Sequence, residues 1–261
     1  MTMKLFLPLL AASLLWSQPA KQATHIDSAK MDAAYPKHGI LLDHGAYRVM
    51  AIGREKAGQG EIHEQDTDVV YFVEGTATLI TGGTVKDGKS SATGEIRGTG
   101  VEGGERRNLK AGDVVTIPNG MPHQFTNING PCRYYLVKVR TNDHGKPSNL
   151  TPISKGGALM AGDGYKVSAS HRDKDGVTEE HARDSDVMYF IKGTATIITG
   201  GKVPDGKPAA AEEMRGTKID GGVRQALKPG DVIVVPNTVP HQFVDVRGPL
   251  DYFVVKVRSA Q

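Results

Sequence analysis

Imidazole and carboxylate side chains recur twice in this chain in the same order. Each occurrence has a Glu, a His two residues later, an Asp, and a distant second His: Glu61, His63, Asp68 and His123 first, then Glu179, His181, Asp186 and His241. Two imidazoles and a carboxylate form a donor set for Fe, Mn or Zn that leaves positions free for a substrate. The spacing therefore predicts a divalent transition-metal site and leaves open whether both occurrences bind an ion.

The local pattern indicates how these donors meet. Glu61 and His63 lie two residues apart on an extended segment, so both point to one face. His123 opens another apolar run after the turn Pro-Asn-Gly-Met-Pro. If the two strands are neighbours, the donors converge. The alternative is a metal-free barrel in which His123 caps a strand or forms an internal hydrogen bond.

The acidic residues allow more than one role. Glu61 and Glu179 are predicted as metal ligands or, if they are not ligands, as catalytic acid–base groups. Asp68 and Asp186 are predicted ligands, although a shorter carboxylate can instead orient a neighbouring His. A further shared stretch pairs Glu with Arg at Glu95/Arg97 and Glu213/Arg215. The favoured interpretation is a structural ion pair with the nearby Glu, or an interface between halves or subunits, and the alternative is an Arg that holds a substrate carboxylate.

An internal repeat supplies the elements that position these residues. Residues 47–140 align with residues 165–258 without a gap, at an offset of 118 residues, and about half of the aligned positions are identical. This length indicates a duplicated domain rather than a solenoid unit. Short runs rich in Val, Ile, Tyr, Phe and Thr end at Gly-containing turns, which is typical of strands. The predicted fold class is all-β, built from sandwiches or barrels.

The remaining segments set the predicted boundaries. Residues 1–20 combine a basic start, an apolar run of about a dozen residues and small residues at the end, which is typical of a secretory signal peptide. The predicted domains are 21–141 and 164–261, with a Gly-, Ser- and Pro-rich linker at 142–163. The protein is therefore predicted to be periplasmic or secreted. Cys132 is the only cysteine, so no internal disulfide forms, and we predict that it is buried in a strand.

Each repeat resembles the cupin superfamily, and the whole chain resembles a bicupin. The second cupin motif is matched in full by Gly112, Pro118, Gly120, His123 and Asn127. In the second repeat Gly230, Pro236 and His241 match, while Thr238 and Asp245 replace the Gly and Asn. In the first motif, His63 and His181 match the second His, and Gly75 and Gly193 match the Gly. The sequence departs where Glu61 and Glu179 replace a His and where Asp68 and Asp186 replace a Glu.

The resemblance implies two tandem jelly-roll barrels with the motifs facing the interior and a metal held there. It also implies a metal-dependent enzyme: a dioxygenase-like oxidoreductase, or a decarboxylase or isomerase, acting on a small polar, enol or carboxylate substrate. The departures from the first motif keep a second hypothesis open, a non-catalytic secreted cupin that binds a metal or small ligand.

Charge and composition limit the partners. The net charge of +3 is small, and Lys and Arg are scattered among Asp and Glu, so no nucleic-acid surface is predicted. After signal-peptide cleavage no segment of membrane-spanning length remains. The predicted partner is a small molecule. A homodimer is compatible with the sequence, although the duplication can supply the same pairing within one chain.

Overall fold

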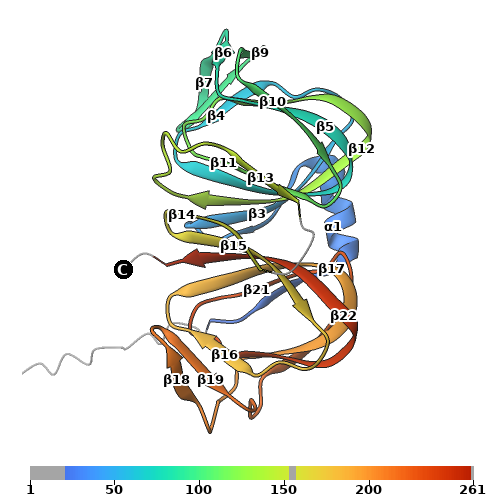
Figure 1. Cartoon of the computed structure of the whole chain (residues 1–261), viewed down its shortest axis with the longest axis vertical. Coiled ribbons are helices and arrows are strands. Elements are labelled where there is room, and N and C mark those ends of the chain that lie inside the picture. The colour runs from blue at the N-terminus through green and yellow to red at the C-terminus, as the bar shows by residue number, and fades with distance from the viewer. Residues whose placement is uncertain (1–20, 153–156, 260–261) are drawn as a thin grey trace, which may run out of the picture.

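The computed structural model describes residues 21–152 and 157–259, so the predicted signal peptide lies outside the described residues. Two barrels, each made from a ten-stranded sheet, are stacked along the long axis of the molecule (Figure 1). One short α-helix and one 3-10 turn are the helical elements within the described residues. The all-β prediction is confirmed.

The N-terminal barrel contains one long sheet with β10, β3 and β2 attached beside its main path and a separate two-stranded ribbon, β6 with β9. Its elements are β2 Gly39–Asp43, β3 Tyr47–Arg54, β4 Gly60–His63, β5 Asp66–Thr81, β6 Thr84–Lys86, β7 Lys89–Ala92, β8 Glu95–Gly98, β9 Gly100–Glu102, β10 Glu105–Lys110, β11 Asp113–Ile117 and β12 His123–Arg140.

The C-terminal barrel repeats this plan with β16, β17 and β22 in the places of β4, β5 and β12. Its elements are β14 Gly157–Gly162, β15 Tyr165–Arg172, β16 Thr178–His181, β17 Asp184–Thr199, β18 Lys207–Ala210, β19 Glu213–Gly216, β20 Val223–Leu227, β21 Val232–Val235 and β22 His241–Arg258.

The two longest strands of the N-terminal barrel, β5 and β12, pair antiparallel along most of their length. Register shifts between Thr126 and Tyr134 bend β12, and Gly75 bends β5 at a φ of 78°. A side chain at Gly75 would approach the Pro131 carbonyl oxygen to 2.6 Å, so this bend requires glycine. The bend lets the two long strands curve around the interior and bring β4 beside the start of β12.

Both faces of β5 are buried over residues 66–72, which explains the apolar run at residues 69–73. Val70 and Phe72 face the barrel interior. Val69 and Tyr71 face the other barrel and share one core with Phe253 and other residues of the second repeat. The rings of Tyr71 and Phe253 lie 5.7 Å apart and are stacked. The two repeats therefore pair through apolar and aromatic side chains within one chain.

Two short segments outside the repeats add strands to the two sheets. β1 (Thr24–Ile26) pairs with β21 of the C-terminal barrel, and β13 (Asn149–Pro152) pairs with β11 of the N-terminal barrel. Residues 24–26 of the predicted first domain join the second sheet, and the predicted linker at 142–163 contains β13 and β14. Both segments lie outside the repeat, so the alignment carried no information about their pairing.

A helical connection follows β1. Helix α1 (Ser28–Ala34) begins at the cap residue Asp27, whose carboxylate accepts a hydrogen bond from the backbone N–H of Lys30. The 3-10 turn η1 (Tyr35–Lys37) continues it and leads into β2. Helix α1 lies at the side of the junction between the barrels (Figure 1). No helix within residues 21–152 and 157–259 has the length and apolarity needed to cross a membrane.

Candidate metal centre

The N-terminal triad of Glu61, His63 and His123 is assembled by strand pairing. Glu61 and His63 share one face of β4, and the register places Glu61 opposite His123 at the start of β12. Both imidazoles are buried, and their ring centroids are 5.0 Å apart. One potential ligand atom from each of the three residues lies within 4.8 Å of the others. The donors predicted to converge therefore lie together.

Hydrogen bonds orient both rings. His63 Nδ1 lies 2.6 Å from Glu95 Oε2, and His123 Nδ1 donates to the Met121 carbonyl at 3.0 Å. The Nε2 atoms consequently face the interior, 3.7 Å and 4.0 Å from Glu61 Oε2. A ring that donates through Nδ1 carries its lone pair on Nε2, which is the form that binds a metal.

Asp68 lies beside this triad but is held by a lysine. Its Oδ1 accepts a hydrogen bond from Lys138 Nζ at 2.6 Å, and its Oδ2 lies 3.5 Å from His63 Nε2. Burial opposes ionisation of Asp68, but the ammonium of Lys138 and the imidazoles of His63 and His123 together outweigh burial and hold the carboxyl pKa below its ordinary value. Asp68 thus adjoins the predicted ligands as half of a buried ion pair.

The two imidazoles have opposite electrostatic surroundings. Burial disfavours the charged form of His63, but the carboxylates of Asp68 and Glu95 outweigh burial and raise its pKa. Burial and the neighbouring His63 lower the pKa of His123 to about 4. His123 is therefore neutral near neutral pH, as a metal ligand must be.

A cavity of about 450 Å³ opens onto the triad. Arg97 reaches it and lies 3.1 Å from Glu61 Oε1. The interpretation of Glu95 and Arg97 as a structural ion pair with each other is therefore wrong in this half, because each contacts a member of the triad instead. Arg54 also lines the cavity: it donates to the hydroxyl of Tyr134 at 2.7 Å and lies 5.4 Å from the centre of the Phe125 ring.

Three of these side chains, Arg54, Tyr134 and Lys138, were missed in the sequence, although the repeat marks all of them. They recur as Arg172, Tyr252 and Lys256. Lys138 also follows Tyr134 and Leu136 in the alternation of β12, so it belongs to a row that faces the interior. A charged residue in a row that faces the interior was the signal from which Lys138 could have been predicted as part of the site.

The C-terminal triad has the same plan. The ligand atoms of Glu179, His181 and His241 also lie within 4.8 Å of one another, and the two rings are 5.4 Å apart. Asp186 again lies beside the triad, with Oδ2 at 3.4 Å from His181 Nε2. Glu179 Oε1 lies 3.8 Å from Arg215.

The hydrogen bonding around this second triad differs. Lys256 Nζ contacts both oxygens of Asp186, at 2.7 and 2.8 Å, and also lies 2.8 Å from His181 Nε2. Glu213 pairs with Arg215 at 2.5 Å instead of orienting His181. The structural ion pair predicted for Glu213 and Arg215 is thus present in this half. An ammonium group contacts the nitrogen that would bind a metal.

Comparison with known proteins agrees with the architecture. No protein-family model and no curated protein sequence matches the chain. A cupin 2 conserved barrel domain protein from Leptotrichia buccalis is similar in structure, with a TM-score of 0.53 and 10% identity, over 94% of this chain and 93% of that one. An oxalate decarboxylase structure has a TM-score of 0.52 and 11% identity, over 90% and 72%.

Procruciferin, an 11S globulin from Brassica napus, has a TM-score of 0.51 and 7% identity, over 82% of this chain and 77% of its own. Identities this low show the fold alone. The chain has the cupin fold in a two-barrel, bicupin arrangement, as the motifs predicted. It carries two candidate metal sites made of His and Glu, one in each barrel.

Proposed function

We propose that this protein is a secreted or periplasmic metal-dependent enzyme and that its reaction centre is the N-terminal triad. One observation carries the proposal: both imidazoles there donate through Nδ1 to fixed acceptors, so two Nε2 lone pairs converge with the Glu61 carboxylate. Glu61, His63 and His123 would hold an Fe, Mn or Zn ion, which when bound supplies Lewis acidity or, for a redox-active metal, oxygen chemistry.

The side chains around the triad support a reaction on a small anionic or enolic molecule. Arg97 and Arg54 line the same cavity as the triad, and a guanidinium binds a carboxylate or enolate oxygen in two-pronged fashion. Arg97 also fixes Glu61 Oε1, which leaves Oε2 directed at the imidazoles. If Glu61 does not bind the metal, that same oxygen is placed to accept a proton from a bound molecule.

The reaction classes we propose are a dioxygenase-like oxidation, or a decarboxylation or isomerisation, of a small carboxylate or enol. The likeness to an oxalate decarboxylase structure supports only the capacity of this fold for such chemistry. The asymmetry of the two triads supports a single reaction centre in the N-terminal barrel.

Metal analysis combined with single substitutions tests the proposal. The secreted form is purified, loaded separately with Fe, Mn and Zn, and assayed for bound metal and for oxygen uptake or carbon dioxide release with a panel of small acids and enols. We expect His63→Ala and His123→Ala each to lose metal and turnover. The paired variant His181→Ala/His241→Ala should keep both.

Two outcomes contradict the proposal. Metal content that is unchanged in the His63 and His123 variants, and in the paired C-terminal variant, removes the basis for a metal enzyme. Metal bound at the N-terminal triad without turnover on any member of the panel favours the non-catalytic binding protein.

A further inference from the structure

One side of the cavity over the N-terminal triad is built from apolar side chains. Met50 and Ile52 lie two residues apart on β3, so they share one face of that strand. The register places Leu136 of β12 opposite Met50 and Tyr134 opposite Ile52, which puts all four on the same face of the sheet. All four line the cavity together with the triad. A molecule that fills the cavity therefore contacts both these four residues, the apolar wall, and the metal site.

The cationic side chains of this lining differ in their partners. Arg97 lies 3.1 Å from Glu61 Oε1. Lys138 donates a hydrogen bond to Asp68 at 2.6 Å. Arg54, in contrast, has no carboxylate oxygen of the described residues within 4.0 Å, and Glu61 attracts it without contacting it. Within the described part of the chain, Arg54 is thus the one guanidinium or ammonium group of the lining that forms no ion pair.

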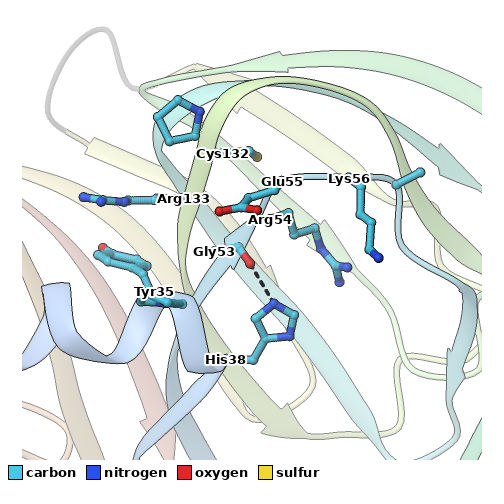
Figure 2. A pocket seen from close by; sticks show the side chains of 11 residues that line it. Tyr35, His38, Gly53, Arg54, Glu55, Lys56, Cys132 and Arg133 are labelled. Carbon is cyan, nitrogen blue, oxygen red and sulfur yellow. Dashed lines mark hydrogen bonds between the residues drawn. The ribbon is translucent and has the colours of Figure 1, made fainter.

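The position of the Arg54 guanidinium is fixed by its neighbours. Its Nε donates to the Tyr134 hydroxyl at 2.7 Å, and its Cζ lies 5.4 Å from the centre of the Phe125 ring. A Cβ at Gly58 would lie 2.6 Å from Nη1, so a side chain there would displace the group. Figure 2 shows the guanidinium turned away from the Glu55 carboxylate. Nη1 and Nη2 remain to donate to an anion, which a guanidinium binds through two parallel hydrogen bonds.

The second repeat lacks both features. Serine replaces the two β3 side chains of the apolar wall, at Ser168 and Ser170. The counterpart of Arg54 is Arg172, which lies 3.9 Å from Glu179 Oε1 and so has a carboxylate partner. The fold does not require the apolar wall, because the second repeat forms the same kind of barrel with serine there. The wall and the unpaired guanidinium occur together beside the triad that we propose as the reaction centre.

We infer that the substrate is an acid or enol with an apolar body: Arg54 binds its anionic oxygen, and the apolar wall contacts its body beside the triad. The inference rests on the proposed function and narrows its substrate class from small polar molecules in general. Cavities that bind small molecules commonly combine an apolar lining with a few polar groups that fix the orientation of the ligand. Met50 and Ile52 are then the residues that determine specificity.

Binding of matched monoanions tests the inference. Zinc-loaded protein is titrated by calorimetry with acetate, with heptanoate and with (2-methoxyethoxy)acetate, which has the chain length of heptanoate but oxygen in place of two CH2 groups. Each CH2 group that becomes buried corresponds to roughly fourfold in affinity. We expect heptanoate to bind at least about tenfold more tightly than either of the other two probes.

Substitutions separate the two parts of the subsite. Met50→Ser introduces the residue of the second repeat and should reduce the preference for heptanoate over the diether, whereas Ser168→Ala in the other barrel should not. Arg54→Met removes a hydrogen-bond donor to the anion and should weaken binding of all three probes by about tenfold. The matched variant Arg172→Met should bind them as the unmodified protein does.

Equal affinities of the unmodified protein for heptanoate and the diether would overturn the inference, and this comparison depends on no variant. A heptanoate preference that is undiminished in Met50→Ser, or unchanged affinities in Arg54→Met, would overturn it as well. The titration is repeated without zinc, because the apolar wall and Arg54 belong to the chain itself. A failure to bind zinc then counts against the proposed function, and a missing heptanoate preference counts against the apolar subsite.

Discussion

The two barrels of this chain contain the same triad, but the hydrogen-bond partners around it differ. In the N-terminal barrel Glu95 orients His63, and Lys138 donates a hydrogen bond to Asp68. In the C-terminal barrel Glu213 turns to Arg215, and Lys256 reaches His181 Nε2 as well as Asp186. We therefore propose that retention of the donor residues is not enough for a metal site. The partners of each donor decide whether its lone pair is free.

The largest expected effect comes from removing the lysine of the C-terminal site together with its partner. In Lys256→Met/Asp186→Asn, His181 Nε2 loses its ammonium neighbour, and no unpaired charge remains. We expect bound metal to rise from one to two ions per chain, measured by elemental analysis after dialysis. The matched variant Lys138→Met/Asp68→Asn should stay at one. No gain in the C-terminal variant would show that Lys256 does not control that site.

Breaking one buried ion pair is the next largest effect. Lys138→Met leaves Asp68 charged and buried, which costs about 3–5 kcal/mol when one partner of a buried pair is removed. Denaturant unfolding of the metal-free protein should show this loss. The double variant Lys138→Met/Asp68→Asn should recover most of it. Equal stabilities of the single and double variants would contradict a charged Asp68.

A smaller effect is expected at the residue that orients His63. Glu95→Gln should weaken metal binding by about 10–100-fold, because groups that orient a ligand imidazole contribute to affinity on this scale. Glu213→Gln, the matched change in the other barrel, should leave metal affinity unchanged. Competition with a chromophoric chelator measures both. Similar losses in the two variants would place working metal sites in both barrels.

The smallest effect is a pH dependence that the two barrels share. The pKa values of Asp68 and Asp186 are lower in the folded chain than their ordinary value of about 3.8. Each carboxylate therefore contributes stability above that value, and the contribution is lost as the pH falls through the folded pKa. Metal-free protein should lose stability below about pH 4. Double variants that remove either Asp–Lys pair should show a shallower loss, and an unchanged slope would contradict ionised carboxylates.

Much of the fold followed from the sequence because the repeat preserved strand patterns and turn glycines together. The meeting of Glu61, His63 and His123 also followed, since strand periodicity and the turn before His123 determine which face each residue occupies. The pairing of β1 with the C-terminal sheet and of β13 with β11 could not be predicted, because neither segment belongs to the repeat. The different partners of Lys138 and Lys256 escaped prediction too, since identical residues at matched positions give no sign of a changed hydrogen bond.

Anomalous X-ray diffraction from crystals loaded with zinc tests the central claim most directly, because it locates each ion without reference to activity. The account predicts a peak bound by Glu61, His63 and His123, and no peak between Glu179, His181 and His241, where Lys256 lies against His181. Peaks of equal height in both barrels, or a peak in the C-terminal barrel alone, would contradict it.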